Sequence, residues 1–214
     1  MSFERVGIIG DIHAETVRLE IALDFLHQEQ VDCILCVGDI VDGQGSVDVC
    51  CELLKESDVI IVRGNHDRWF TERSMRDLPE ATQWENVNER SKYFIKSLPS
   101  TQTLETITGK LLLCHGIGTN DMQRLTPDDF GYALHVIEEL HTLIRNRQYR
   151  FVINGHTHRR MVRQFEHLSV INAGTLYYAH NPCMAVADFR AKQVQFYDFR
   201  EFDLVQSGKP NQMA

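Results

Sequence analysis

The chain has 214 residues, of which 43% are hydrophobic and 24% charged, the balance of an ordinary globular protein. Its apolar runs are all too short to cross a bilayer, which excludes a membrane-spanning protein and a membrane partner. The formal net charge of −8 means that the average surface repels polyanions, which counts against sequence-independent binding of nucleic acids.

Short apolar runs alternate with helical patterns in the first third of the chain. We expect strands over residues 6–9, 33–37 and 59–62, each closed by a glycine, with helices over residues 15–29 and 47–55 between them. This β-α-β-α-β order predicts parallel strands at the start of an α/β sheet. The N-terminus enters its first strand at once and lacks the pattern of a signal peptide, so we expect a cytoplasmic protein.

Cys33 and Cys36 form a C-x-x-C pair, which is compatible with a zinc site or a redox site. However, no second cysteine pair lies at a suitable spacing, and both residues belong to the apolar run "DCILCVGD". Buried reduced thiols are the favoured interpretation.

The rest of the chain predicts a second group of strands. We expect helices over residues 88–97 and 128–147, the second beginning at the N-terminal signal "TPDD", and strands over residues 111–114 and 151–153. Further strands over residues 161–165, 169–171, 184–188 and 194–199 predict a second, more antiparallel sheet. Residues 1–206 are expected to form one domain, and residues 207–214 a frayed polar tail.

Five of the expected strands end in a tight turn that carries metal-type ligands. In open α/β sheets, sites gather beyond the carboxyl ends of the strands, so these turns can meet in one crevice. The five stretches are "IIGDIH", "CVGDIVD", "VRGNHD", "LLCHG" and "VINGHTH".

Each stretch has a simpler explanation when it is taken alone. An aspartate after a glycine is commonly a turn former, and a histidine at the end of a strand is more often a hydrogen-bonded structural residue than a ligand. The alternating histidines of "GHTH" are harder to explain as core. Only the presence of all five stretches, in this order, makes the signal specific.

The side chains in these turns select a class of metal site. Two carboxylates, one amide oxygen and four histidines form a mixed oxygen and nitrogen set, which suits manganese, iron, nickel or zinc, with manganese favoured. The set exceeds the needs of one ion, so we expect two divalent ions that share a carboxylate. The residues are Asp11, His13, Asp39, Asn65, His115, His156 and His158.

The ordered motifs D-x-H, G-D-x-x-D, G-N-H-D, H-G and G-H-x-H resemble those of the calcineurin-like metallophosphoesterases. The segment "INAGTL" is similar to the Asn-Pro-Gly-Ser segment of the small bacterial and archaeal phosphodiesterase-type members, with Ala173 in place of the proline. The resemblance implies an α/β fold of two facing mixed β-sheets flanked by helices, in four layers ordered α/β/β/α.

The resemblance also implies a role for each residue. Three residues would bind the first ion and three the second, and one aspartate would bridge the two. His66 would face the leaving-group oxygen as a proton donor or charge stabiliser, and Asp42 would orient it. The implied ligands are Asp11, His13 and His158 for the first ion, Asp39 for the bridge, and Asn65, His115 and His156 for the second.

The expected activity is therefore hydrolysis of a phosphodiester, or a phosphomonoester, of a small molecule by in-line attack of a metal-bridging hydroxide. Gly43 stands where the larger Ser/Thr phosphatases of the family have a phosphate-binding arginine, and Arg63 and Arg68 are candidate substitutes. Two alternatives are a nuclease that acts on nucleic-acid ends and a non-catalytic scaffold. The substrate and the oligomeric state are left open.

Overall fold

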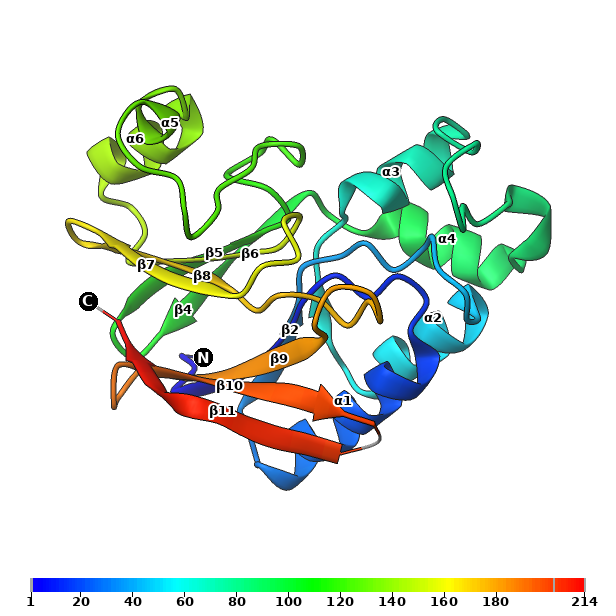
Figure 1. The fold of residues 1–214 in the computed structure, drawn as a ribbon, viewed down its shortest axis with the longest axis horizontal. Helices are drawn as coiled ribbons and strands as arrows, with labels where there is room; N and C mark the ends of the chain where they lie inside the picture. The colour runs from blue at the N-terminus through cyan, green and yellow to red at the C-terminus, as the bar shows by residue number, and fades with distance from the viewer. Residues whose placement is uncertain (1, 202, 214) are drawn as a thin grey trace.

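Two β-sheets face each other and carry helices on their outer faces (Figure 1). The computed structural model describes residues 2–201 and 203–213. The first sheet has the strand order β11-β10-β9-β1-β2-β3, and the second has the order β4-β5-β6-β8-β7. The fold is the four-layer arrangement that the motifs implied.

The first sheet consists of β1 (Arg5–Ile9), β2 (Cys33–Cys36), β3 (Ile60–Ile61), β9 (Cys183–Asp188), β10 (Gln193–Arg200) and β11 (Asp203–Gln212). The second consists of β4 (Thr101–Thr106), β5 (Gly109–Cys114), β6 (Phe151–Asn154), β7 (Met161–Phe165) and β8 (Leu168–Asn172). The helices are α1 (Thr16–Gln28), α2 (Val47–Glu56), α3 (Asn65–Glu72), α4 (Glu89–Ser97), α5 (Tyr132–His135) and α6 (Glu138–Asn146), with a 3-10 turn at Trp84–Asn86. None of the described helices is long and apolar enough to span a membrane.

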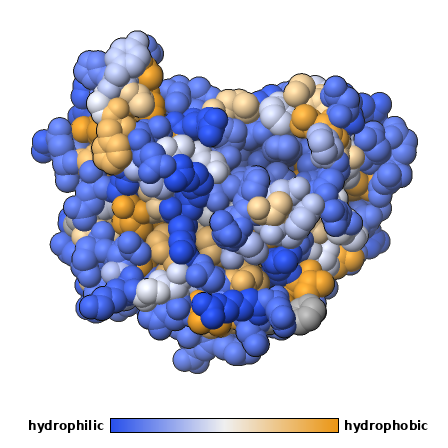
Figure 2. Space-filling view, viewed as in Figure 1, coloured by the Kyte–Doolittle hydropathy of each residue, from blue (hydrophilic) through white to orange (hydrophobic). Residues whose placement is uncertain are grey.

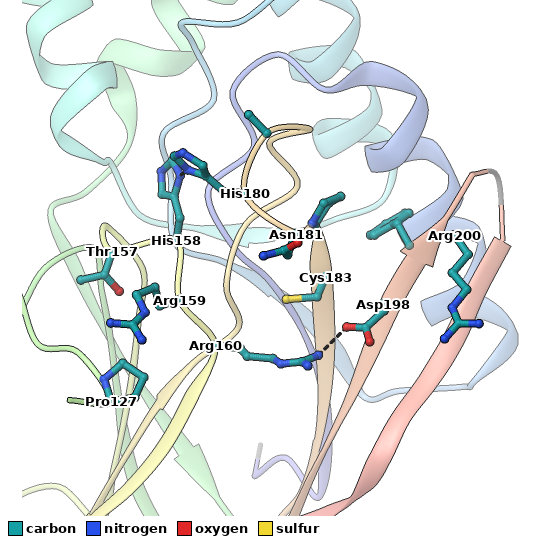
Figure 3. Close-up of a pocket in the computed structure, with 13 residues that line it drawn as sticks. Pro127, Thr157, His158, Arg159, Arg160, His180, Asn181, Cys183, Asp198 and Arg200 are labelled. Carbon is teal, nitrogen blue, oxygen red and sulfur yellow. Dashed lines mark hydrogen bonds and ion pairs between the residues drawn. The ribbon is translucent and has the colours of Figure 1, made fainter.

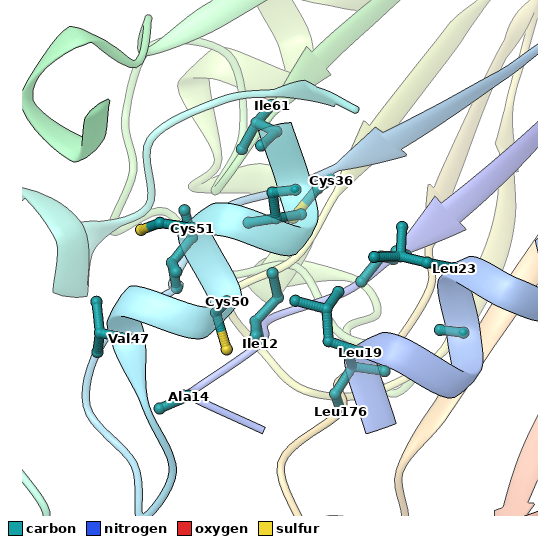
Figure 4. Close-up of a cluster of buried hydrophobic side chains, with 14 of the residues drawn as sticks. Ile12, Ala14, Leu19, Leu23, Cys36, Val47, Cys50, Cys51, Ile61 and Leu176 are labelled. Atoms are coloured by element: carbon teal, nitrogen blue, oxygen red, sulfur yellow. The ribbon is translucent and has the colours of Figure 1, made fainter. Parts of the chain in front are cut away.

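Three layers of buried side chains hold this arrangement together. The inner layer joins the two sheets and includes Ile8 and Leu35 of the first sheet and Phe151 of the second, all fully buried. A second layer packs α1, α2 and α4 on the outer face of the first sheet (Figure 4). The third lies between the second sheet and α6. Because strands β1, β2, β5 and β6 are covered on both faces, they are apolar throughout rather than alternating.

The C-terminal strands belong to the first sheet, which corrects the prediction that the second half of the chain forms a sheet of its own. β9 pairs antiparallel with β1, with Arg5 opposite Asp188 and Ile9 opposite Met184. β10 then pairs with β9, and β11 with β10. Strand periodicity identifies each strand, but it does not say which edge the strand joins.

The helix expected over residues 128–147 is also wrong as a single element. Gly131 has a φ of +55°, which ends any helical run there, and α5 and α6 are separate helices. Asp129 accepts a hydrogen bond from the Thr126 N–H at 2.6 Å, so "TPDD" forms a turn and not the start of a long helix. Phe130, expected on the buried face, is 70% exposed.

Residues 207–212, expected to fray, form the end of β11. Ser207 lies opposite Phe196, and Gln212 lies opposite Gln193. The strand is polar because it is at the edge of the sheet, where one side is solvated and a proline such as Pro210 is tolerated. Met213 follows it into the core between the sheets, with 4% of its surface exposed.

Met213→Ala tests this placement of the C-terminal residues. Removal of a buried methionine side chain leaves a cavity, so we expect the free energy of unfolding to fall by about 2–3 kcal/mol. Met122→Ala is the matched control, since Met122 is 44% exposed, and it should change stability by less than about 0.5 kcal/mol. Chemical denaturation measures both, and equal effects of the two substitutions would contradict the burial of Met213.

Candidate metal centre

The seven predicted ligand residues meet at one end of the two sheets. They follow β1, β2 and β3 of the first sheet and β5 and β6 of the second, and the parallel pairing of these strands brings their carboxyl ends to the same edge. The Oδ1 atom of Asn65 lies 2.9 Å from His115 Nε2 and 2.8 Å from His156 Nδ1. His13 Nε2 and His158 Nε2 are 3.0 Å apart.

The outer ring nitrogens of three of these histidines are already engaged. Nδ1 of His13 donates to the Asp42 carbonyl at 2.9 Å, and Nδ1 of His115 donates to the Val37 carbonyl at 2.8 Å. Nδ1 of His158 lies 2.7 Å from Nδ1 of His180. Such bonds orient the imidazole and leave Nε2 of each ring for the centre, as is usual for metal-binding histidines.

Two facts about unpaired atoms show that this donor set fits a cation. Asp11 is fully buried, and its Oδ2 atom has no hydrogen-bond partner among the residues that the structure describes. The Nε2 atoms of His13 and His158 face each other. At most one of these two nitrogens can carry a proton toward the other, so at least one lone pair points into the centre. A divalent ion satisfies the unpaired carboxylate oxygen and the facing nitrogens together.

The pKa shifts of the buried residues also indicate that the centre favours a cation. Burial disfavours the charged form of His115, but the carboxylates of Asp39 and Asp11 outweigh it and raise the pKa of His115 to about 10. Burial raises the pKa of Asp11. Burial also opposes ionisation of Asp39, yet the neighbouring histidines lower its pKa. The two buried carboxylates therefore draw positive charge into the centre.

Asp39 lies between two sets of candidate ligand atoms. One set joins His13, Asp39 and His66, and the other joins Asp11, Asp39 and His115, with the atoms of each set within 4.8 Å of one another. Asp39 is common to both sets, and its role as the bridge between two ions stays a prediction. The backbone permits this position only because residue 64 is glycine, since a Cβ atom there would lie 2.1 Å from Asp39 Oδ1.

The turns that present these residues are strained. Five of the predicted site residues are not glycine and still have left-handed backbone conformations, with φ between 48° and 68°. Each such conformation costs about 1–3 kcal/mol and persists only where the surrounding structure enforces it. The five residues are His13, Asp39, Asp42, His156 and His158.

Asn65 and His66 point in different directions because they are consecutive residues of a helix. Both belong to the first turn of α3, a helix that the sequence pattern did not reveal. Consecutive residues of a helix are separated by about 100°. Asn65 therefore faces His115 and His156, while His66 turns toward Asp42, whose Oδ2 atom lies 2.7 Å from Nδ1 of its ring.

Arg76 was missed at the sequence level, and it holds the same aspartate. Its Nη1 and Nη2 atoms donate to Asp42 Oδ1 and Oδ2 at 2.8 and 2.9 Å. The Thr82 N–H donates to Asp42 Oδ1 at 2.9 Å. Burial opposes ionisation of Asp42, but these bonds and that of His66 lower its pKa. No motif marks Arg76, because it comes from a loop 34 residues further along the chain.

The two arginines predicted to bind substrate have other partners in the structure. Arg68 donates to both oxygens of Asp121, at 2.6 and 3.0 Å, so carboxylates already occupy its guanidinium group. Arg63 is partly exposed, and its main-chain N–H donates to the Pro99 carbonyl. Substrate binding by either arginine stays a prediction. Trp69 packs against the His66 ring, with the two centroids 4.8 Å apart.

A model of the calcineurin-like phosphoesterase superfamily domain matches residues 5–192. An uncharacterized protein of Methanocaldococcus jannaschii is 32% identical over 62 residues, which cover 29% of this chain and 26% of that protein. The match therefore spans about a quarter of that relative's length.

Solved structures share the fold at low sequence identity. A metallophosphoesterase from Sphaerobacter thermophilus has a TM-score of 0.70 and 20% identity, with 93% of this chain and 89% of that one covered. An archaeal phosphodiesterase has a TM-score of 0.59 and 20% identity, with 91% and 99% covered. Vacuolar protein sorting 29 from Cryptosporidium parvum has a TM-score of 0.60 and 18% identity, with 99% and 100% covered.

Asp39→Asn tests whether the centre binds metal. Because Asp39 belongs to both sets of candidate ligand atoms, its neutralisation should lower the bound manganese from about two ions per chain to less than one. The measurement is elemental analysis after manganese loading and desalting. Asp203→Asn, on exposed β11, is the control and should bind as the wild type does. An unchanged metal content in Asp39→Asn would contradict the bridging position.

Proposed function

The chain belongs to the calcineurin-like phosphoesterase superfamily, and from this premise we propose that it is a metal-dependent hydrolase of a small phosphodiester. One observation carries the proposal. Seven potential ligands and a His66–Asp42 pair converge at the ends of five strands, where a phosphoryl group would have cations on one side and an acid on the other.

We assign the ligands in two groups, with manganese as the favoured metal and iron, nickel or zinc as alternatives. When bound, two such ions supply an activated water and neutralise charge on the phosphoryl oxygens. Asp39 is assigned to the bridge because it belongs to both sets of ligand atoms. Those sets also place Asp11 near His115 and include His66, which we assign as the acid and not as a ligand. The first ion would be held by Asp11, His13 and His158, and the second by Asn65, His115 and His156.

His66 is assigned as the proton donor to the leaving oxygen. Burial opposes its charged form, but the hydrogen bond to Asp42 and the charge of Asp39 outweigh burial and raise its pKa. The ring therefore keeps more of its proton near neutral pH. Asp42 fixes Nδ1 of the ring, so Nε2 is the atom left to deliver the proton. Arg76 fixes Asp42 in turn, and its two bonds hold the carboxylate in one orientation.

A non-catalytic scaffold is the second candidate, because the fold of vacuolar protein sorting 29 is similar. Fold alone does not decide activity. What favours hydrolysis is the retention of both the full ligand set and the paired histidine, since a scaffold needs neither an acid nor the carboxylate that orients it. A nuclease that acts on nucleic-acid ends is disfavoured by the net charge of −8.

His66→Ala tests the assignment of the acid. In assays with manganese, nickel or zinc and an aryl phosphodiester, we expect kcat to fall by about 10²–10⁴ with little change in metal content. His27→Ala, an exposed histidine of α1, is the control. Turnover by His66→Ala at the wild-type rate would overturn the role of His66, and loss of bound metal would make it a ligand. If the wild-type protein hydrolysed neither diesters nor monoesters with any of these ions, the proposed function would be wrong.

Arg76→Met tests the orienting role of Arg76. We expect kcat to fall by roughly 10–100-fold while KM and metal content stay close to the wild-type values, because Arg76 acts through Asp42 and His66. The downfield proton NMR signal of the His66 Nδ1–H should weaken as well. Arg90→Met, on the exposed face of α4, should change neither quantity. An unchanged NMR signal together with a reduced kcat would contradict orientation as the cause.

A further inference from the structure

A groove of about 820 Å³ lies beside the metal centre and extends along the ends of β9 and β10 (Figure 3). His158 lines it, and the Nε2 atom of His158 lies 3.0 Å from Nε2 of His13, so the groove adjoins the centre at His158. The volume falls within the range of about 300–1,000 Å³ that is usual for small-molecule sites. A substrate whose phosphodiester lies at the centre would place part of its body here.

The walls of this groove are rich in arginine. Arg159, Arg160 and Arg200 line it, and Asp198 is the one carboxylate among its lining residues in the described part of the chain. The chain as a whole has a net charge of −8, so this concentration of arginine runs against the average charge of the protein. Strongly hydrophilic side chains occupy the middle of this face in Figure 2.

The three arginines differ in their carboxylate partners. Arg160 is paired with Asp198 across the groove (Figure 3). Arg159 lies 2.6 Å from Asp128, which is not among the lining residues. Within residues 2–201 and 203–213, no carboxylate lies within ion-pair distance of Arg200. A guanidinium group carries five N–H donors, so even the paired arginines keep donors for a further anion.

We propose that this groove binds a second phosphate group of the substrate. The substrate is then a small phosphodiester that carries another phosphate away from the scissile bond. Arginine forks match the tetrahedral oxygens of phosphate better than they match uncharged groups. The inference rests on the proposed function, because it takes the reacting phosphodiester to lie at the metal centre.

The simpler explanation is a set of surface arginines paired with surface carboxylates, which contribute little energy. Two features separate the groove from that case. The arginines line a concave surface that reaches a candidate metal ligand, and no carboxylate of residues 2–201 and 203–213 neutralises Arg200. Both features predict a binding energy that depends on the distal phosphate.

Two matched probes test the proposal with the full, manganese-loaded chain. They are the p-nitrophenyl ester of thymidine 5′-phosphate and the same ester with an added 3′-phosphate. We expect the 3′-phosphate to lower KM by roughly tenfold in the wild type, and Arg200→Gln to remove most of this advantage without changing kcat. Arg190→Gln is the matched control, since Arg190 is exposed and pairs with Glu4.

Calorimetry of two ligands that lack the aryl leaving group separates binding in the groove from turnover of the esters. Thymidine 3′,5′-bisphosphate should bind the wild type about tenfold more tightly than thymidine 5′-phosphate does, and Arg200→Gln should remove the difference. Equal affinities, no binding, or a difference that survives in Arg200→Gln would each overturn the proposal. If neither ester is hydrolysed but the calorimetric difference appears, the proposed function fails and the phosphate-binding groove stands. A 3′-O-succinyl probe that gains as much as the 3′-phosphate would overturn the assignment to phosphate.

Discussion

Two carboxylates buried where the sheets meet are the constraint around which this structure is arranged. Asp11 and Asp39 are both at most 1% exposed. A buried unpaired charge costs many kcal/mol, so positive charge has to lie nearby. The histidines that surround the carboxylates lower the pKa of Asp39, and in return His115 holds its proton up to a pKa of about 10. Metal ions would replace that proton as the source of positive charge.

The strained turns bring side chains to this same centre. A left-handed conformation at five non-glycine positions is unfavourable locally, but it directs side chains from the ends of β1, β2 and β6 toward one point. The rigid parallel strands beneath them absorb the strain. Their apolar side chains fill the space between the sheets, and Ile8, Leu35 and Phe151 have no measurable exposure. The packing of the core therefore holds the geometry of the centre in place.

Three regions around the centre have separate tasks. In the proposed function the strand ends would supply most of the ligands, and α3 would supply the acid, which Asp42 orients. Arg76 and Thr82 both bond to Asp42, so the loop after α3 holds the orienting carboxylate although it carries no motif. The third region is the groove beside His158, where arginines from two separate segments meet. Similar folds serve proteins described as phosphoesterases and a vacuolar sorting protein, so these local arrangements, and not the fold, distinguish the activities.

The sequence by itself determined the units that are local. Each strand with its glycine turn and its ligands lies within about ten residues, where apolar runs and turn residues are direct signals, and the motifs in order predicted the two-sheet fold. Tertiary structure decided what depends on distant contacts. It joined β9 to β1 and not to the second sheet, replaced the single helix expected over residues 128–147 by two short helices that both follow Gly131, and brought Arg76 to Asp42. The physical reason is that hydrophobic periodicity records only whether a residue is buried, whereas the choice of partner depends on the summed energy of contacts between segments far apart in the chain.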